Sequence, residues 1–379
     1  MPFTLPNYSE LTNSQRQILN LPVDKNHVVT GAPGTGKSVL AVYRASDMHN
    51  AHMKVLLLVY NRPLKQYISS AVGELCLNAE VKTWNSWISS FYKKHFGHNP
   101  PDIHGESFTY DWAKIKQDFQ RVEAHYDHII IDEAQDFPIE LIEALRIISS
   151  GISCFMDENQ TIADTHTTYQ DVVKAFDLPT RHTLSENFRN PKEIFDFAKL
   201  YSDSQDLATP IHNINHKPEM VKCESYATSN ELIFKMVKYI RNQMCGCRSI
   251  GVFVNPNSLS NTYEELRHRL NMSGDPDVFM YKPKTEFDNP DFDVDGVFVL
   301  SFGTMKGLEF DGVLIPKCER IKSKNNQNLD RNIIYVAATR ASKELVCFYK
   351  SKTVAPGRID IFSPLAGHEE VLRWRGINE

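Results

Sequence analysis

The first half of the chain alternates short apolar runs with longer amphipathic stretches. Runs of four or five mostly apolar residues predict strands that are buried on both faces; they lie at 27–30, 55–59, 128–131 and 153–156. Stretches with helical spacing of their apolar residues separate these runs, at 37–49, 63–75, 84–95 and 139–148. Such alternation predicts an α/β fold in which helices cover a parallel sheet.

The second half of the chain repeats this pattern. Strands are expected at 219–223, 249–254, 297–301, 313–315 and 345–349, and helices at 230–244, 260–271 and 330–341. A new helix begins after Asn190 and Pro191, which favours a boundary at about 181–184. We therefore predict two α/β domains at 1–182 and 183–379, the first with a small helical insertion at about 88–127.

Composition narrows the class of protein without identifying a partner. The chain has 379 residues, of which 41% are hydrophobic and 23% charged, as in ordinary globular proteins. A formal net charge of −5 argues against binding nucleic acid over the whole surface, although a local basic groove needs only a few Lys and Arg.

The cysteines and the apolar runs indicate where in the cell the protein is expected. Only Cys245 and Cys247 of the seven cysteines are close in sequence, and no second pair gives zinc-finger spacing, so we interpret them as reduced thiols. Neither a signal peptide nor an apolar run long enough to span a bilayer is evident. We expect a soluble, cytoplasmic protein without a membrane partner.

A glycine-rich segment between a predicted strand and a predicted helix fits the phosphate-binding P-loop pattern. Its glycines let backbone N–H groups face phosphates, and the helix N-terminus adds positive potential. In such a loop Lys37 reaches the β- and γ-phosphates of ATP, and Ser38 binds Mg²⁺. The candidate nucleotide-binding residues are Gly31, Ala32, Pro33, Gly34, Thr35, Gly36, Lys37 and Ser38.

Two carboxylates follow the strand predicted at 128–131. A P-loop needs an acid that orients the metal, on a neighbouring strand, so Asp132 is the candidate for the Mg²⁺ shell. Glu133 is the candidate general base that polarises the attacking water. The alternative is an acidic N-cap of the following helix, which could apply in part to Asp136.

Two segments then match a known family in order. They resemble superfamily 1 helicases of the UvrD/Rep/PcrA type, in a compact form without the large accessory insertions. The resemblance implies two RecA-like lobes with ATP in the cleft between them, and Gly307 and Glu309 as nucleotide contacts. The matching residues are Asp132, Glu133, Ala134, Gln135 and Asp136, and Lys306, Gly307, Leu308, Glu309 and Phe310.

Further segments extend the resemblance along the chain. Residues 11–15 resemble the adenine-reading motif, with Gln15 as the base reader, and residues 156–160 resemble the motif that makes Gln160 the γ-phosphate sensor. Residues 186–190 imply that Phe188 stacks on adenine and Arg189 contacts the γ-phosphate. Residues 335–341 imply that Arg340 is a second arginine finger. By themselves, both arginines could be surface salt-bridge partners.

Candidate nucleic-acid contacts carry weaker signals. The resemblance assigns the nucleic-acid track to Tyr60, Asn61, Thr83, Trp84, Ser301 and Thr304. Aromatic side chains can stack on bases, while Thr and Asn can hold phosphates. The alternative for Trp84 and Trp87, three residues apart, is the core face of one helix.

The chain departs from the family at several positions. Gly303 stands where the family has a histidine, and residues 161–164 replace its aromatic and tryptophan–arginine pair. The first accessory insertion is reduced to a short stretch whose Lys93 and Lys94 form either a basic edge or solvated surface. The second accessory insertion is essentially absent. We therefore hypothesise a motor that unwinds poorly alone and depends on a partner.

The leading interpretation is a Mg²⁺-dependent ATPase that moves along single-stranded or partly duplex DNA, with 3′→5′ polarity implied by the resemblance. The alternative is a regulatory ATPase that activates a partner such as a separate nuclease. A non-catalytic nucleotide-binding module is a third class, which the full set of ATPase residues disfavours.

Overall fold

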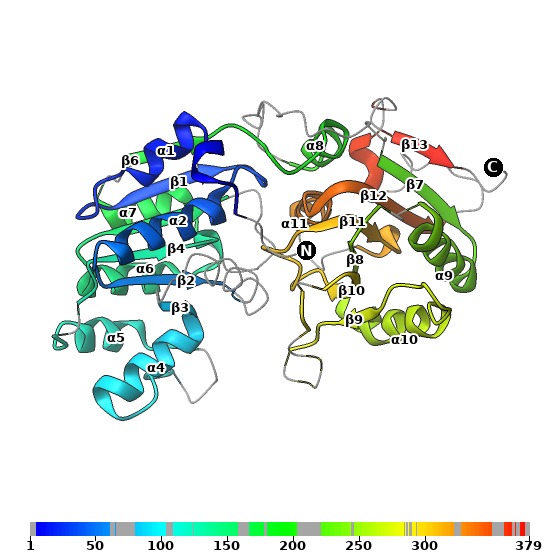
Figure 1. Ribbon diagram of the computed structural model, residues 1–379. Helices are drawn as coiled ribbons and strands as arrows, with labels where there is room; N and C mark the ends of the chain where they lie inside the picture. Colours follow the sequence, from blue (N-terminus) through cyan, green and yellow to red (C-terminus); the bar gives the residue numbers. More distant parts are fainter. Residues whose placement is uncertain are drawn as a thin grey trace. The chain divides into compact units, whose positions relative to one another are not determined.

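The computed structural model describes residues 5–60, 65, 80–103, 109–123, 125–157, 167–177, 180–202, 221–243, 246–283, 285, 287, 290–292, 294–321, 327–350, 360–365, 368 and 372–375. The chain divides into two compact units between Ser185 and Glu186. We call residues 3–185 the first lobe and residues 186–379 the second lobe. Each lobe contains one parallel sheet with helices packed on it (Figure 1).

The first lobe is built on a six-stranded sheet in the order β3-β2-β4-β5-β1-β6. All of its described strand pairs are parallel. Every residue of β2, β4 and β5 is buried, so both faces of the sheet are covered there. The strands are β1 (His27–Gly31), β2 (Val55–Val59), β3 (Glu80–Thr83), β4 (His128–Ile131), β5 (Ile152–Met156) and β6 (Thr180–Leu184).

The helices of the first lobe pack against this sheet or against one another, and most residues of the helix at Lys37–Asn50 are buried. Trp87 and Phe91 of α4 pack on Phe119 of α5, with ring centroids 6.1 and 5.0 Å from it. The described helices are α1 (Asn13–Leu19), α2 (Lys37–Asn50), α4 (Trp84–Phe96), α5 (Trp112–Phe119), α6 (Ile139–Leu145) and α7 (Tyr169–Phe176). Short 3-10 turns lie at Tyr8–Glu10, Ala134–Asp136 and Arg146–Ile148.

The second lobe has a seven-stranded sheet in the order β13-β7-β12-β11-β8-β10-β9, and its described pairs are all parallel. Its strands are β7 (Val221–Tyr226), β8 (Ser249–Val254), β9 (Val278–Met280), β10 (Gly296–Ser301), β11 (Phe310–Ile315), β12 (Ala341–Lys350) and β13 (Leu372–Arg375). Its helices are α8 (Lys192–Lys199), α9 (Ser229–Lys238), α10 (Leu259–Arg269) and α11 (Gln327–Ala338). Shorter helical segments lie at Tyr239–Gln243, Pro256–Ser258, Cys318–Arg320 and Asp360–Leu365.

The predicted α/β class is confirmed, and each lobe has the all-parallel sheet and flanking helices of a RecA-like unit. The strands predicted at 55–59, 128–131 and 249–254 are found with those bounds. The helix predicted at 63–75 lies outside the described residues, apart from Lys65. In the part of the chain that the structure describes, no helix has the length and apolar character needed to cross a membrane.

Three details differ from the sequence-based expectations. Residues 180–184 form β6, the strand at one edge of the first sheet, so they belong to the first lobe. Each of the helices predicted at 139–148 and 230–244 changes geometry partway, to a 3-10 turn after Leu145 and a π-helical turn after Lys238. Finally, β5 lies between β1 and β4, so the acid-bearing strand is not the direct neighbour of the P-loop strand.

Candidate functional site

The segment between β1 and α2 curls into a loop that depends on glycine. Gly34 and Gly36 have φ of +76° and +89°, a region that side-chain-bearing residues rarely adopt. Gly36 is also the N-cap of α2, so the helix starts at Lys37 with its first N–H groups at the loop. The hydroxyl of Thr35 donates to the carbonyl of Ala32 at 2.8 Å and closes the turn. This geometry suits the phosphate-binding role that the sequence predicts for the loop.

The Lys37 side chain folds over this loop. Its ammonium donates to the carbonyl oxygens of Gly31 at 2.7 Å and Ala32 at 3.0 Å, and only 6% of the residue is exposed. A buried ammonium group needs such acceptors because losing its hydration is costly. The positive charge is therefore already at the loop.

Gln15 connects α1 to the same loop. Its side-chain oxygen accepts from the N–H of Thr12 at 3.0 Å, and its amide nitrogen donates to the carbonyl of Thr35 at 3.2 Å. A Cβ atom at Gly36 would lie 2.8 Å from the Nε2 atom of Gln15. The predicted base reader thus lies against the P-loop backbone.

The acid pair follows β4 directly. Asp132 is fully buried, and neither of its carboxylate oxygens accepts a hydrogen bond of standard geometry from the described residues. Burial and then the charge of Glu133 raise the pKa of Asp132, while Ser38 and Lys37 lie close enough to oppose that rise. An unsatisfied buried carboxylate beside a hydroxyl fits the oxygen ligands that Mg²⁺ prefers. Ser38 and Asp132 are the residues that could hold this ion.

Glu133 has an unusual backbone for a non-glycine residue. Its φ of +55° and ψ of +45° are left-handed, and it caps the 3-10 turn Ala134–Asp136. Such a conformation costs roughly 1–2 kcal/mol and persists only where the surroundings impose it. The turn directs the chain away from β4 immediately after the acid pair.

Gln135 links Glu133 to the next strand of the sheet. Its Nε2 atom donates to Glu133 at 2.5 Å, and its Oε1 atom accepts from the N–H of Asp157, just after β5, at 3.0 Å. Gln135 is fully buried, so this amide is a fixed bridge between the ends of β4 and β5. Gln135 belongs to the matching segment 132–136, but the resemblance implies no role for it. A buried amide between an acid pair and a strand end has no sequence signal of its own.

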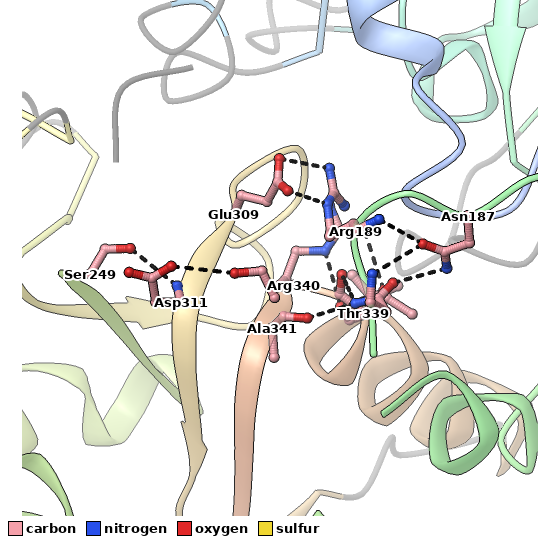
Figure 2. A network of polar contacts seen from close by, with 11 residues as sticks. Asn187, Arg189, Ser249, Glu309, Asp311, Thr339, Arg340 and Ala341 are labelled. Carbon is pink, nitrogen blue, oxygen red and sulfur yellow. Dashed lines mark hydrogen bonds and ion pairs between the residues drawn. The ribbon is translucent and has the colours of Figure 1, made fainter. Parts of the chain in front are cut away.

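The second lobe brings its predicted nucleotide residues together around Arg189 (Figure 2). The Nε atom of Arg189 lies 2.7 Å from Oε1 of Glu309, and Nη2 donates to Oε2 at 3.1 Å. This bidentate pair is partly exposed, with 17% and 27% of the two side chains accessible. Gly307, two residues earlier, has φ of +76°, and Phe188 is half-buried.

Arg340 lies at the end of α11 and is only 1% exposed. Its guanidinium donates to the carbonyl of Val336 at 3.1 Å and to the hydroxyl of Thr339 at 3.3 Å. The first contact satisfies a carbonyl in the last turn of α11, and the second involves Thr339, the residue just after the helix. The surface salt-bridge alternative therefore does not describe Arg340, whereas Arg189 does form an ion pair.

The candidate nucleic-acid residues divide between the two lobes. Trp84 is 8% exposed and packs among Tyr110 and Phe137, so its contacts are those of a core residue. Tyr60 is half-buried on the same core, and burial followed by the charge of Asp136 raises the pKa of its hydroxyl. Their roles in nucleic-acid binding stay predictions.

The other candidates in this group are Thr83, Ser301 and Thr304. Thr83 is buried at the end of β3. The hydroxyls of Ser301 and Thr304 lie 3.1 Å apart in the loop after β10. A Cβ atom at Gly303 would meet nothing within 4 Å, so this loop has room for a side chain there. Asn61 and Gln160 lie outside the described residues.

Comparisons with known proteins agree with the helicase resemblance. Residues 24–220 match the Schlafen group 3 DNA/RNA helicase domain, and residues 296–347 match the UvrD-like helicase C-terminal domain. One solved structure, the C-terminal domain of a possible DNA helicase from Lactobacillus plantarum WCFS1, is 17% identical with a TM-score of 0.35. That match covers 49% of this chain and 98% of the other. No curated protein matches the chain at a significant level.

The fold and the site together define a helicase-like α/β protein with two RecA-like lobes. The first family match covers more than half of the 379 residues. The chain therefore belongs to the Schlafen group 3 DNA/RNA helicase domain family. The resemblance to UvrD-like helicases is confirmed by the match in the second lobe.

Proposed function

We propose that the chain is a Mg²⁺-dependent ATPase that moves along single-stranded DNA and uses ATP hydrolysis to translocate or to unwind. The observation that carries this proposal is the buried carboxylate of Asp132 beside Ser38, Lys37 and the P-loop. Buried carboxylates in proteins usually accept several hydrogen bonds. The oxygens of Asp132 lie beside Ser38 but accept no hydrogen bond of standard geometry from the described residues.

The first lobe supplies binding and proton transfer in this mechanism. The P-loop N–H groups and Lys37 hold the phosphates, and Gln15 contacts adenine. Ser38 and Asp132 would hold Mg²⁺, which would neutralise charge on the phosphate oxygens. Glu133 takes the proton of the attacking water, and Gln135 keeps its carboxylate oriented through the bond to Oε2.

The second lobe supplies positive charge to the transferring phosphoryl group. Arg189 and Arg340 take this role in the proposal, and Phe188 stacks on the base. Arginines of this kind raise the hydrolysis rate by about 10³–10⁵-fold in related phosphoryl-transfer enzymes. To contact the phosphate, Arg189 would have to break its ion pair with Glu309. Nucleotide binding would therefore be coupled to the contacts of Arg189 within the second lobe.

The test is ATP turnover by the purified chain with Mg²⁺, alone and with single-stranded DNA of increasing length. A translocating motor predicts stimulation that increases with strand length and then reaches a plateau, for any base sequence. Turnover that DNA does not change would contradict translocation and favour a switch that depends on a protein partner. Absence of turnover under all conditions would contradict the ATPase itself.

A further inference from the structure

Two fully buried asparagines, Asn187 and Asn190, join separate segments of the second lobe. Figure 2 shows Asn187 beside Arg189. The Oδ1 atom of Asn187 accepts from the N–H groups of Arg189 at 2.9 Å and Asn190 at 3.1 Å. Its Nδ2 atom donates to Oδ1 of Asn190 at 3.2 Å. The backbone of Arg189 is therefore held in a turn by a side chain two residues earlier.

Asn190 reaches across to the other arginine. Its Nδ2 atom donates to the carbonyl oxygen of Thr339 at 3.2 Å and to that of Ala341 at 2.7 Å. These two residues flank Arg340, and they lie about 150 positions later in the chain. One amide thus holds the backbone on both sides of Arg340.

A second set of contacts, at the start of β11, also connects Arg189 to Arg340. The N–H of Phe310 donates to the carbonyl of Arg340 at 2.9 Å. Glu309, the preceding residue, forms the bidentate pair with Arg189. Each arginine is therefore connected to the other twice, once through the asparagines and once through Glu309 and Phe310.

The chemistry of these positions requires an amide. Asn190 uses both hydrogens of its Nδ2 group as donors and its oxygen as an acceptor, which neither Asp nor Leu of similar size can do. Replacing it would leave the carbonyls of Thr339 and Ala341 without these buried donors. A residue that only filled the core would not need this polarity.

We propose that Asn187 and Asn190 are positioning residues that set Arg189 and Arg340 as one unit for ATP hydrolysis. This inference rests on the proposed function of the two arginines. The asparagines act through the backbone of the arginines. They hold two groups, from segments far apart in sequence, in one fixed relation to the same phosphoryl group.

The first measurement is steady-state ATP turnover by full-length variants with saturating single-stranded DNA. Asn187→Ala and Asn190→Ala are each expected to lower kcat by about 10–100-fold, as misplacement of a catalytic group does. The KM for ATP should stay within about twofold, because the P-loop is untouched. Asn230→Ala, an exposed asparagine at the start of α9, is the matched control and should behave as the natural chain.

The second measurement separates positioning from a general structural role. In an Arg189→Ala background, Asn187→Ala should lower the single-turnover rate no further than about twofold, because the group that it positions is gone. Asn190→Ala is tested in the same way in an Arg340→Ala background. Equal proportional losses in both backgrounds would overturn the proposal.

The outcomes distinguish this proposal from the proposed function. If the natural chain hydrolyses ATP and neither asparagine variant is impaired, positioning is wrong and the ATPase stands. If the natural chain does not hydrolyse ATP, both fall. Should Asn190→Ala fail to fold, Asn187→Ala decides the matter, since it keeps both bonds from Asn190 to Thr339 and Ala341.

Discussion

Glu133 is held in a strained backbone conformation immediately after a buried aspartate, and Gln135 fixes its carboxylate. Strain of this kind is common where a side chain must be aimed at a reacting atom. Asp132 and Glu133 are adjacent carboxylates with different surroundings. Asp132 lies beside Ser38 and accepts no hydrogen bond of standard geometry from the described residues, whereas Glu133 accepts one from the Gln135 amide. That difference supports one metal ligand and one base.

We expect Glu133→Gln to lower kcat by about 10²–10⁴-fold, because it removes the proposed general base and keeps the shape of the side chain. Binding of a fluorescent ATP analogue should persist, since the P-loop and Lys37 are unchanged. The exposed Glu123→Gln variant is the control. Normal hydrolysis by Glu133→Gln would show that another group takes the proton.

Gln135→Ala tests whether orientation of Glu133 matters. The variant removes the donor to Glu133 and the side-chain acceptor of the Asp157 N–H, at a cost of about 1–3 kcal/mol in unfolding free energy. We expect kcat to fall by about tenfold or more with little change in KM. Urea unfolding and turnover are measured together, with exposed Gln17→Ala as control. A loss of stability without a loss of kcat would reduce Gln135 to a structural role.

At the scale of elements, three parallel strands bring the candidate residues to one edge of the first sheet. The P-loop follows β1, the acid pair follows β4, and β5 between them ends just before Asp157. Carboxyl ends of parallel strands meet at the same edge. The intervening strand gives Gln135 a backbone N–H to bind, which direct pairing of β1 with β4 would not provide.

The structure of the loop between β1 and α2 predicts that alanine at Gly36 and alanine at Gly97 have different effects on ATP affinity. Gly36 and Gly97 both have positive φ, so alanine at either position costs roughly 1–2 kcal/mol in strain. Only at Gly36 would the new Cβ meet Gln15, whereas at Gly97 it meets nothing within 4 Å. We expect both variants to lose similar stability in thermal unfolding. Only Gly36→Ala should also lose ATP affinity, measured by titration with a fluorescent analogue.

Equal ATP affinities for the two glycine variants would show that Gln15 does not depend on the P-loop backbone. A lower affinity for Gly97→Ala would point to a longer-range effect through α4, whose C-terminus Gly97 caps. The comparison is informative because the backbone strain is shared and only the contact differs.

Strands were predicted correctly where both faces are buried, because burial alone then determines which residues are apolar. The runs at 55–59 and 128–131 are buried on both faces, so their apolar character marks their full length. β3 and β6 were missed because their residues are polar or half-buried, as Lys82 and Arg181 illustrate. The core role of Trp84 was one of two open readings, and only the packing against Tyr110 and Phe137 separates them.

Only those parts of the candidate site that lie within short, contiguous sequence motifs could be predicted. The P-loop and the acid pair are local patterns, and each has a physical reason to recur. The bonds from Asn190 to Thr339 and Ala341 join residues about 150 positions apart, and no spacing rule connects them. Contacts of this kind depend on strand order, which the alternation of elements does not specify.

At the scale of the whole molecule, the first lobe carries a pH-sensitive core. Burial and then the charge of Arg44 lower the pKa of His128 from 6.5 to about 3. The geometry agrees with a neutral ring, because Nδ1 lies 2.6 Å from the carbonyl of Val23 and Nε2 lies 2.8 Å from the hydroxyl of Ser153. As the pH falls below about 6.5, His128 is therefore protonated in the unfolded chain but stays neutral in the folded lobe.

Stability from His128 is complete above pH 6.5 and is lost as the pH falls toward 3. We expect the unfolding free energy of the first lobe to drop by about 2 kcal/mol from this residue between pH 8 and pH 5. Urea unfolding at the two pH values measures it, and His128→Gln should show a pH dependence smaller by that amount. The exposed His125→Gln should retain the full dependence, and an unchanged dependence in His128→Gln would contradict the assignment.

The strand order has a consequence for synthesis of the chain. β1 pairs on one side with β5 and on the other with β6, whose first residue, Thr180, comes 153 positions after His27, the first residue of β1. At typical translation rates of about 5–20 residues per second, the P-loop strand waits roughly 8–30 s on the ribosome for its last neighbour. During that interval the backbone of β1 has unpaired N–H and C=O groups, which can pair with another chain. The nascent first lobe is therefore the stage of synthesis at which protection by chaperones against aggregation matters most.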